Sequence, residues 1–397
     1  MSTIVGLDIG TTKVCVCIGN LTKNGEIEIV GEGTKPCLGL ARGMVSNIQT
    51  TVSAIEDAMK QARYMSGEKI ESVIVGISGG TIKGVTKHGL ISIKKEREIS
   101  KFDINRVIEI AKAGDIPSGR EIIYTLSQSF NVDDHDGIEN PVGMTGHRLE
   151  ADVYIITSAT TAIQNLTKCI EKAGYRVIGK PVASLLAASL AVLYDDEMRL
   201  GVCLIDVGGG TTDMGIFLDG TLHHLYSIPI GGTNVTSDIS KIIRTSIDEA
   251  EKLKKERGCC LSSLVLSDEE ISFSSLGEIS ETVPRHALSE IIQSRMEEIF
   301  SLLNNELERF KPRINAGCVL IGGGSMINGA VELAKEMLGM SCRIGVPKGI
   351  AGLTDAVNTP IYATPAGLVV WGVKHYGKKA SAREAMGWFS KIKEYFT

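Results

Sequence analysis

The beginning of the chain alternates apolar and polar positions in the way that is typical of β-strands. The segments 2–10, 13–20 and 26–33 are short, rich in β-branched residues and separated by turns of Gly, Thr and Asn. Such a pattern predicts three antiparallel strands. A helical pattern, with apolar residues three and four positions apart, follows at 50–67 and ends at a Gly.

Strands and helices alternate over the remaining length. A helix is predicted at 99–114, with Ser100 as its N-cap, and a second β-hairpin at 199–222. The other predicted elements are strands at 72–78 and 151–159, a helix at 161–175, and a strand, a Gly loop and a helix within 316–339. This order of elements predicts an α/β fold.

The two predicted hairpins resemble each other. Residues 4–19 and 202–217 each contain a strand that ends in Asp, a turn of Gly and Thr, and a second strand. Two halves of like design predict a duplicated fold with a cleft between the halves.

Composition narrows the classes of function. The 397 residues carry a net charge of −5, so the surface as a whole offers no basic field for nucleic acid. The nine Cys are scattered without a CxxC pair, which favours a reducing compartment without disulfides or zinc. The longest apolar run, 182–193, is shorter than the roughly 20 residues of a membrane span. We also expect no signal peptide, because the first residues lack a basic region and a cleavage site.

The two turns of Gly and Thr carry the candidate chemistry. Glycines let the backbone approach a ligand, N–H groups and Thr hydroxyls can hold phosphate oxygens, and carboxylates can hold Mg²⁺ through water. One such hairpin is often merely structural, but two at this spacing favour a clamp for a polyphosphate. The candidate residues are Asp8, Gly10, Thr11, Thr12 and Lys13 in the first turn, and Asp206, Gly208, Gly209, Gly210, Thr211, Thr212 and Asp213 in the second.

Three further stretches bear on this site. The segment 321–335 predicts a strand, a Gly turn and a helix, whose N-terminus can receive a nucleotide. Gly231 and Gly232 form another pair that can close over phosphates. A charged helix at 247–258 places Glu251 and Lys254 on one face, and taken alone it is typical of a solvated, salt-bridged helix.

These motifs together resemble the actin–sugar kinase–chaperone superfamily over nearly the whole chain. Within it, the chain is similar to the FtsA family of bacterial cell division proteins. Three segments support this resemblance: 87–159, 249–260 and 385–397. The first of them resembles the insertion that is peculiar to that family. The resemblance implies an actin-like ATPase fold, α/β, with two duplicated lobes around a nucleotide cleft and the FtsA-type insertion, subdomain 1C.

The resemblance also implies the ligands ATP and Mg²⁺. The two Gly and Thr turns match the family's phosphate loops, with Asp8 and Asp206 directed to the metal. Glu251 and Lys254 match the pair that faces adenine and ribose. The adenosine loop matches Gly322, Gly323, Gly324 and Ser325.

The implied order of subdomains is 1A, 1C, 1A, 2A, 2B, 2A and a return to 1A. The expected boundaries are 1–83 (1A), 84–160 (1C), 161–197 (1A), 198–228 (2A), 229–312 (2B), 313–377 (2A and the return to 1A), 378–385 (linker) and 386–397 (terminal helix).

One position departs from the superfamily pattern. Many actin-like ATPases carry a Glu or Gln that positions the attacking water just before a Pro or Ala, whereas this chain has Lys180 before Pro181. Lys cannot act as a carboxylate base, so we expect ATP binding with weak or absent hydrolysis, with the nucleotide acting as a switch.

The end of the chain has an amphipathic pattern. From 374 onward the chain has six basic and two acidic residues, which gives a local net charge of +4. The composition of 376–384 is typical of a linker. At 100° per residue the large apolar side chains fall within an arc of roughly 120°, opposite Lys391 and Lys393. Such a face is typical of an interfacial membrane helix, although a helix docked on the protein is an alternative. The apolar residues are Trp388, Phe389, Ile392, Tyr395 and Phe396.

The resemblance further implies partners and a location. It implies a protein that polymerises and tethers FtsZ filaments to the inner face of the cytoplasmic membrane at the division septum, and that recruits later division proteins through subdomain 1C. The FtsZ C-terminal peptide would bind subdomain 2B, where Arg295 and Glu298 match the peptide-binding helix. Two alternatives stay open at this point: a small-molecule kinase of the same superfamily, and a pilus-assembly adaptor.

Overall fold

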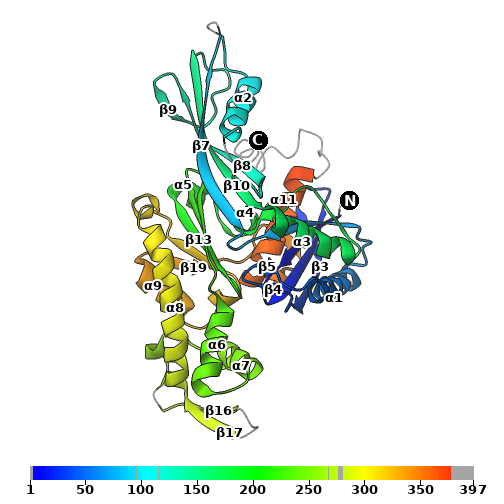
Figure 1. Ribbon diagram of the computed structural model, residues 1–397, viewed down its shortest axis with the longest axis vertical. Helices are drawn as coiled ribbons and strands as arrows, with labels where there is room; N and C mark the ends of the chain where they lie inside the picture. Colours follow the sequence, from blue (N-terminus) through cyan, green and yellow to red (C-terminus); the bar gives the residue numbers. More distant parts are fainter. Residues whose placement is uncertain (1–2, 95–96, 115, 267, 276–279, 377–397) are drawn as a thin grey trace.

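The computed structural model describes residues 3–376, apart from 95–96, 115, 267 and 276–279. Two lobes lie side by side in the middle of the molecule (Figure 1). A small sheet projects at one end, and a helical region with a β-hairpin lies at the other (Figure 1).

The first lobe is built on a seven-stranded sheet in the order β11-β6-β1-β2-β3-β20, with β12 paired to β6. Its strands are β1 (Thr3–Ile9), β2 (Lys13–Leu21), β3 (Ile27–Pro36), β6 (Ser72–Ile77), β11 (Arg176–Val177), β12 (Val182–Ala183) and β20 (Ile350–Gly352). Its helices are α1 (Ile48–Ser66), α3 (Thr160–Lys172), α4 (Ser184–Val192), α10 (Thr354–Val357), the 3₁₀ helix η4 (Pro360–Tyr362) and α11 (Ala363–Tyr376). A separate hairpin joins β4 (Leu40–Ala41) to β5 (Met44–Val45).

The second lobe is built on a five-stranded sheet in the order β15-β14-β13-β18-β19. Its strands are β13 (Val202–Val207), β14 (Thr212–Leu218), β15 (Thr221–Ile228), β18 (Cys318–Ile321) and β19 (Cys342–Ile344). The helices of this half are α5 (Asp195–Leu200), α6 (Gly232–Ile243), α7 (Ile247–Arg257), α8 (Arg285–Leu307), α9 (Ala330–Leu338) and the 3₁₀ helices η1 (Ser262–Leu264), η2 (Lys311–Arg313) and η3 (Gly323–Met326). The distal hairpin pairs β16 (Glu270–Ser274) with β17 (Ser280–Pro284).

The predicted duplication is present in the strand pairing. In the first lobe β1 pairs antiparallel with β2 and parallel with β6; in the second, β13 pairs antiparallel with β14 and parallel with β18. Asp8 and Asp206 each stand one residue before the end of the first strand of their hairpin. The three antiparallel strands, the second hairpin and the α/β class predicted from the sequence are therefore confirmed.

The sheet of the second lobe is buried on both faces. Because side chains alternate along a strand, Val202 and Leu204 join the core of the first lobe, whereas Cys203 and Ile205 join the core under α6, α8 and α9. One sheet thus separates two apolar cores, which fixes the second lobe firmly beside α4.

The small projecting sheet has a core of its own, here called the insert core, which includes Ile99, Val107 and Val153. Its order is β7-β10-β8-β9, and the elements are β7 (Ile82–Ser92), α2 (Lys101–Lys112), β8 (Arg120–Val132), β9 (His135–Ile138) and β10 (Arg148–Ala159). We call residues 82–159 the insert.

The insert contacts both lobes. On the first lobe, Tyr124 packs edge-on against Trp371 of α11 at 4.8 Å between ring centres. On the second, Gln128 Nε2 donates to the carbonyl oxygens of Leu222 and His223, both at 3.3 Å. The backbone N–H of Leu225 donates to the Tyr154 hydroxyl at 2.7 Å. The insert therefore bridges the edge strand of the second lobe and the last helix of the first.

Helix ends follow the sequence signals in most places. Gly67 ends α1 with φ 67°, and Ser100 precedes α2, where the Asp103 carboxylate accepts its N–H. The strand, Gly loop and helix predicted within 316–339 are present as β18, the turn at Gly322 and α9, which begins at Ala330 after the short helix η3. Gly322 and Gly329 have φ of 82° and 76°, which interrupts the helical backbone on both sides of η3.

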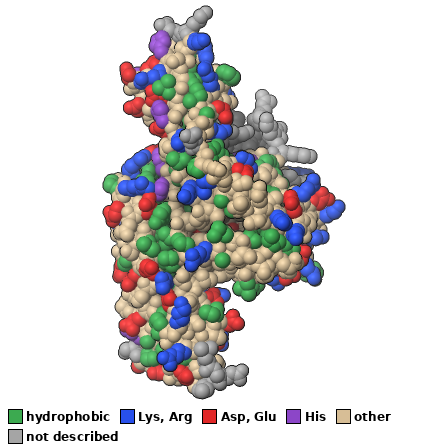
Figure 2. Space-filling view, in the orientation of Figure 1, with side chains coloured by type: hydrophobic (Ala, Val, Ile, Leu, Met, Phe, Trp, Pro, Cys, Tyr) green, Lys and Arg blue, Asp and Glu red, His purple; other side chains and the backbone are tan. Residues whose placement is uncertain are grey.

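Two properties of the surface bear on partners. No helix within the described ranges combines the length and the apolar content that spanning a bilayer requires. On the face shown in Figure 2, Lys and Arg side chains are interspersed with Asp and Glu.

We predict that Gly367→Ala destabilises the fold. A Cβ at this position of α11 would lie 2.0 Å from the Ala187 carbonyl oxygen of α4, so the two helices would have to separate. Overpacking of this kind lowers the free energy of unfolding by about 1–3 kcal/mol, measurable by urea denaturation. Gly80→Ala is the control, since a Cβ there meets nothing within 4 Å. Equal stability of the two variants would contradict the prediction.

Candidate functional site

The two turns of Gly and Thr face each other across the cleft between the lobes. A Cβ placed on Gly209 would lie 2.5 Å from Thr12 Cγ2, and one on Gly210 would lie 2.6 Å from Thr11 Oγ1. We call 10–13 loop 1 and 208–211 loop 2. Each loop is closed by the same hydrogen bond, Gly10 N to Lys13 O at 2.9 Å and Gly208 N to Thr211 O at 3.0 Å. The structure thus brings together the two turns that the sequence singled out.

Three carboxylates stand at the strand ends behind these loops. Asp206 and Asp213 are directly opposite each other on β13 and β14, and Asp8 stands one residue before the end of β1. The pKa of Asp8 is raised to about 6. Burial is the main cause, the charge of Lys13 opposes the rise, and the charge of Asp213 adds to it. Burial, and then the charges of Asp213 and Asp8, raise the pKa of Asp206 to about 7. The site is therefore short of positive charge and suits a cation.

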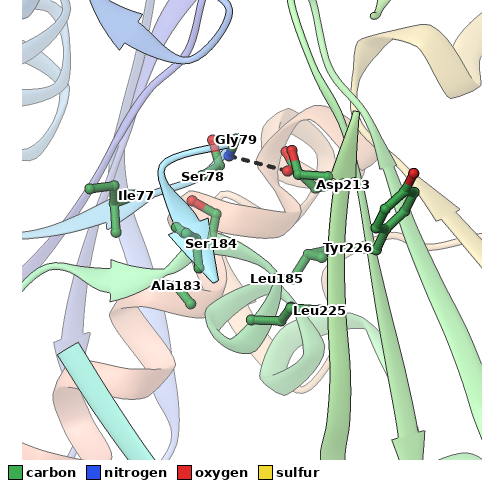
Figure 3. Close-up of a pocket in the computed structure, with 11 residues that line it drawn as sticks. Ile77, Ser78, Gly79, Ala183, Ser184, Leu185, Asp213, Leu225 and Tyr226 are labelled. Atoms are coloured by element: carbon green, nitrogen blue, oxygen red, sulfur yellow. Dashed lines mark hydrogen bonds between the residues drawn. The ribbon is translucent and has the colours of Figure 1, made fainter. Parts of the chain in front are cut away.

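Asp213 is held on the second-lobe side of a pocket between the lobes (Figure 3). Its carboxylate accepts the Gly79 backbone N–H at 3.1 Å and the Thr211 hydroxyl at 3.1 Å. Burial nevertheless raises the pKa of Asp213. Because Gly79 follows β6 of the first lobe, this hydrogen bond ties loop 2 to the opposite lobe.

A metal ion would need ligands besides these side chains. Among the residues that the structure describes, no three His, Cys, Asp or Glu side chains are arranged to hold a metal ion. The carboxylates and the two loops fit an ion that is bound through water and through the oxygens of a phosphate ligand.

Lys13 and the third Gly loop complete the floor of the cleft. A Cβ on Gly322 would lie 2.1 Å from Asp206 Oδ1, and one on Gly324 would lie 2.3 Å from Val207 Cγ1, so this loop packs directly against the end of β13. Lys13 Nζ lies 3.6 Å from the Cβ position of Gly323. Lys13 therefore spans from loop 1 to the third loop. Ser325 is buried, and its hydroxyl donates to the Gly322 carbonyl oxygen at 2.7 Å.

Gly231 and Gly232 pack on the backbone of loop 2. The N–H of Gly232 donates to the Gly208 carbonyl oxygen at 2.9 Å, and a Cβ on Gly231 would lie 2.6 Å from the same oxygen. The pair thus holds loop 2 from the start of α6.

Thr212 differs from the other candidate hydroxyls. Its side chain is fully buried, and its hydroxyl donates to the Ile230 carbonyl oxygen at 2.8 Å. It therefore fixes the hairpin, whereas Thr12 is exposed in the cleft.

The charged helix α7 is docked rather than solvated on the side of Lys254. Lys254 Nζ donates to Glu251 Oε2 at 2.6 Å and to the Gly232 carbonyl oxygen at 3.0 Å, and the Lys254 side chain is buried. Burial lowers the pKa of Lys254 even though Glu251 raises it. The interpretation as a plain surface helix is wrong for this pair, which links α7 to the start of α6.

Lys180 does not reach the cleft. Its side chain is exposed, and its Nζ donates to the Ile122 carbonyl oxygen of the insert at 2.6 Å. The polar residue from this segment that lines the pocket in Figure 3 is Ser184, at the start of α4. The Ser184 hydroxyl is buried, and it has no hydrogen-bond partner among the described residues. Sequence reasoning missed Ser184 and Gly79, because a Ser opening an apolar helix and a Gly in a loop carry no specific signal.

Arg295 and Glu298 lie together on α8. Arg295 Nε donates to Asp238 Oδ2 of α6 at 2.6 Å, and its Nη1 pairs with Glu298. The guanidinium is thus shared by two carboxylates. The predicted membrane-facing residues, Trp388, Phe389, Ile392, Tyr395 and Phe396, lie outside the described residues.

We predict that Asp206→Asn stabilises the ligand-free protein at pH 7.5. The pKa of Asp206 is higher in the folded protein, about 7, than in the unfolded chain, about 4. Between these pH values the folded protein holds a proton that the unfolded chain has released, so the free energy of unfolding falls as the pH rises from about 4 to 7. The variant should melt about 2 °C or more above wild type at pH 7.5. It should also lose less stability between pH 5.5 and 7.5.

Asp219→Asn is the control, because it removes an exposed carboxylate from an ion pair with Arg313, on the turn at the end of β14 opposite to Asp213. Its change between the two pH values should equal that of wild type in differential scanning fluorimetry. A destabilised Asp206→Asn at pH 7.5 would contradict the electrostatic account.

Comparison with known proteins places the chain in a family. Residues 203–367 match the family model described as cell division protein FtsA, and residues 79–157 match the SHS2 domain inserted in FtsA. The chain is 43% identical to cell division protein FtsA of Pseudomonas aeruginosa over 374 residues, which is 94% of this chain and 89% of that protein. It is 34% identical to FtsA of Escherichia coli K12, over 95% of this chain and 90% of that protein.

Solved structures show the same fold at low identity. The type IV pilus biogenesis complex PilM–PilN matches with a TM-score of 0.65 and 15% identity, over 93% of this chain and 98% of that one. MreB5 of Spiroplasma citri bound to ADP matches with a TM-score of 0.54 and 14% identity, over 94% and 96%. These likenesses show an actin-like fold, and the full-length relatives show more: the chain belongs to the FtsA family of cell division proteins.

Proposed function

We propose that this protein binds ATP with Mg²⁺ in the cleft between its lobes. The observation that carries the proposal is the contact of the two Gly and Thr loops, with Gly209 against Thr12 and Gly210 against Thr11. Loops of this kind hold phosphates through N–H groups and hydroxyls. MreB5 of Spiroplasma citri, solved with bound ADP, has the same fold, which supports the proposal.

Each part of the site then has a role. The hydroxyls and N–H groups of loops 1 and 2 bind phosphate oxygens, with Lys13 as a positive charge beside them. Asp8 and Asp206 hold Mg²⁺ through water, and the phosphates supply the remaining ligands. Gly322 to Ser325 receive the adenosine. Glu251 faces the ribose and adenine, and Lys254 fixes its carboxylate.

We propose that the bound nucleotide acts as a conformational switch with weak hydrolysis. At the sequence position where a water-positioning Glu or Gln is expected, this chain has Lys180, whose ammonium group donates a hydrogen bond to the insert. Asp213 already accepts two hydrogen bonds and lies between the lobes, so its role is to join them rather than to orient water.

We further propose that the protein links FtsZ filaments to the membrane at the division septum. The family is the main support, since its members are named cell division proteins. Polymerisation of this chain is proposed from the actin-like fold, of which MamK, solved as a double helical filament, is another example. Relatives at 34–43% identity over nearly the full chain favour this role over a small-molecule kinase or a pilus adaptor.

The two attachment points of this adaptor are separate in the chain. FtsZ would bind through its C-terminal peptide at Arg295 and Glu298, where an acidic group of the peptide competes with Asp238 for the guanidinium. The membrane would be bound by the terminal helix at 386–397 on an anionic surface, on the cytoplasmic side. The insert would recruit later division proteins.

We predict that Gly209→Val weakens ATP binding by at least about tenfold, a change of roughly 1.4 kcal/mol. The added side chain would collide with Thr12 and push loop 2 away from loop 1. Isothermal titration calorimetry with ATP and Mg²⁺ measures the effect. Gly114→Ala is the control, since its nearest neighbour is 3.7 Å from the Cβ position. If wild type itself shows no binding, the nucleotide proposal is wrong.

We predict that the protein carries FtsZ filaments onto anionic vesicles in the presence of ATP. In co-sedimentation, FtsZ should pellet with vesicles and the full chain, but not with a chain that stops at Lys378, because the terminal helix is then missing. Arg295→Ala should itself pellet while leaving FtsZ in solution.

Arg309→Ala is the matched control for this experiment, because Arg309 follows the end of α8, pairs with Glu306 and has no proposed role in peptide binding. It should carry FtsZ as wild type does. Pelleting of FtsZ with the truncated chain would refute the membrane helix, and pelleting with Arg295→Ala would refute the peptide site.

A further inference from the structure

The hairpin β4–β5 ends in a turn with an unusual residue. Leu40 pairs with Val45 and Ala41 with Met44, so Arg42 and Gly43 form a two-residue loop. Their φ angles are 51° and 77°. Two positive φ angles are the signature of a type I′ turn, which prefers Asn-Gly because most side chains disfavour the first position. Arg at this position is therefore costly for the backbone.

The other non-Gly residues with positive φ in the described ranges have local reasons for it. Asp133 accepts the backbone N–H groups of His147 and Arg148. Asp219 pairs with Arg313, and Arg244 ends α6. Arg42 is exposed, and its guanidinium makes no hydrogen bond or ion pair within the described part of the chain. Strain without a local partner is typical of a residue kept for a ligand.

The turn lies where the two phosphate loops meet. The N–H of Gly43 donates to Thr11 Oγ1 of loop 1 at 3.2 Å. A Cβ on Gly43 would lie 3.6 Å from Thr211 Cγ2 of loop 2 and 3.4 Å from the Ser78 carbonyl oxygen. The Arg42 carbonyl oxygen in turn lies 3.4 Å from the Cβ position of Gly79. The turn of Arg42 and Gly43 thus lies at the rim of the cleft, hydrogen-bonded to loop 1 through Gly43 and close to Thr211 of loop 2.

The charges of the cleft call for a further cation. Three carboxylates lie in the site, and the charge of Lys13 lowers the pKa of two of them, Asp8 and Asp206. A nucleoside triphosphate adds more negative charge at its terminal phosphate, which lies farthest from the adenosine loop. An arginine presents a fork of donors that matches phosphate oxygens and keeps its charge at any physiological pH.

We propose that Arg42 is a phosphate-binding arm: its guanidinium folds over the cleft and binds the terminal phosphate of a nucleoside triphosphate. The inference rests on the proposed function, nucleotide binding between the lobes, and adds to it the residue that distinguishes a triphosphate from a diphosphate. Because the same turn touches loop 1, loop 2 and Ser78, the arm also makes the contact of the two lobes depend on the terminal phosphate.

The test uses Arg42→Asn in the full chain. Asn-Gly fits a type I′ turn better than Arg-Gly, so the variant should melt at the wild-type temperature or above it. Its affinity for AMPPNP with Mg²⁺ should fall about tenfold or more, while its affinity for ADP with Mg²⁺ should change less than about threefold. Isothermal titration calorimetry measures both affinities. Arg42→Lys, which keeps the charge but not the fork, should give an intermediate affinity for AMPPNP.

The outcomes separate this proposal from the one on which it rests. If wild type binds neither nucleotide, the proposed function fails and the arm with it. If wild type binds both and Arg42→Asn binds AMPPNP equally well, the arm alone is refuted. Equal losses for AMPPNP and ADP would also refute it, because the contact would not be with the terminal phosphate. A lower melting temperature of Arg42→Asn would overturn the backbone argument.

Discussion

The close approach of two turns sets the distance between the lobes. At Gly209 and Gly210 the backbone of loop 2 comes so near the side chains of Thr12 and Thr11 that a single methyl group would not fit. A second close approach, of Gly322 to the carboxylate of Asp206, positions the third loop in the same way. The cleft is therefore shaped by missing side chains, and every polar group around it takes its place from those contacts.

The spacing has an electrostatic consequence. It places three carboxylates near one another behind loops 1 and 2, and burial together with their mutual repulsion raises the pKa values of Asp8 and Asp206 to about 6 and 7. A site of this kind is less stable when empty at neutral pH than it would be with neutral side chains. A bound cation removes that repulsion. The free energy that the repulsion costs the empty site therefore contributes to the affinity for the cation. Stability and ligand affinity oppose each other at these residues.

Much of this could be read from the sequence, because duplication repeats a local pattern. The strand, Asp, Gly and Thr order occurs twice, and short-range rules predicted both hairpins and the α/β fold. The residues that sequence reasoning missed are those whose roles come from tertiary contacts: Gly79 meets Asp213 across the cleft, and Ser184 reaches the pocket from the start of α4. The predicted helix after the third Gly turn is present as α9, but its start at Ala330, after η3, could not be foreseen, because composition does not reveal the positive φ of Gly322 and Gly329. Lys254 looked solvated because helical spacing does not reveal the Gly232 carbonyl and the Thr236 hydroxyl of α6, which accept hydrogen bonds from its ammonium group.

The insert adds a mechanical property to this architecture. It is anchored at Tyr124 to α11 of the first lobe and at Gln128 and Tyr154 to β15 of the second, while its core and its far end stand clear of both (Figure 1). A body that is held at one end by both lobes would act as a lever on any rotation between them. When the angle between the lobes changes by a few degrees, the displacement is smallest at these anchors and grows toward α2 and β9. A rotation that moves the cleft walls only slightly would therefore move α2 and β9, at the far end of the insert, by a larger distance.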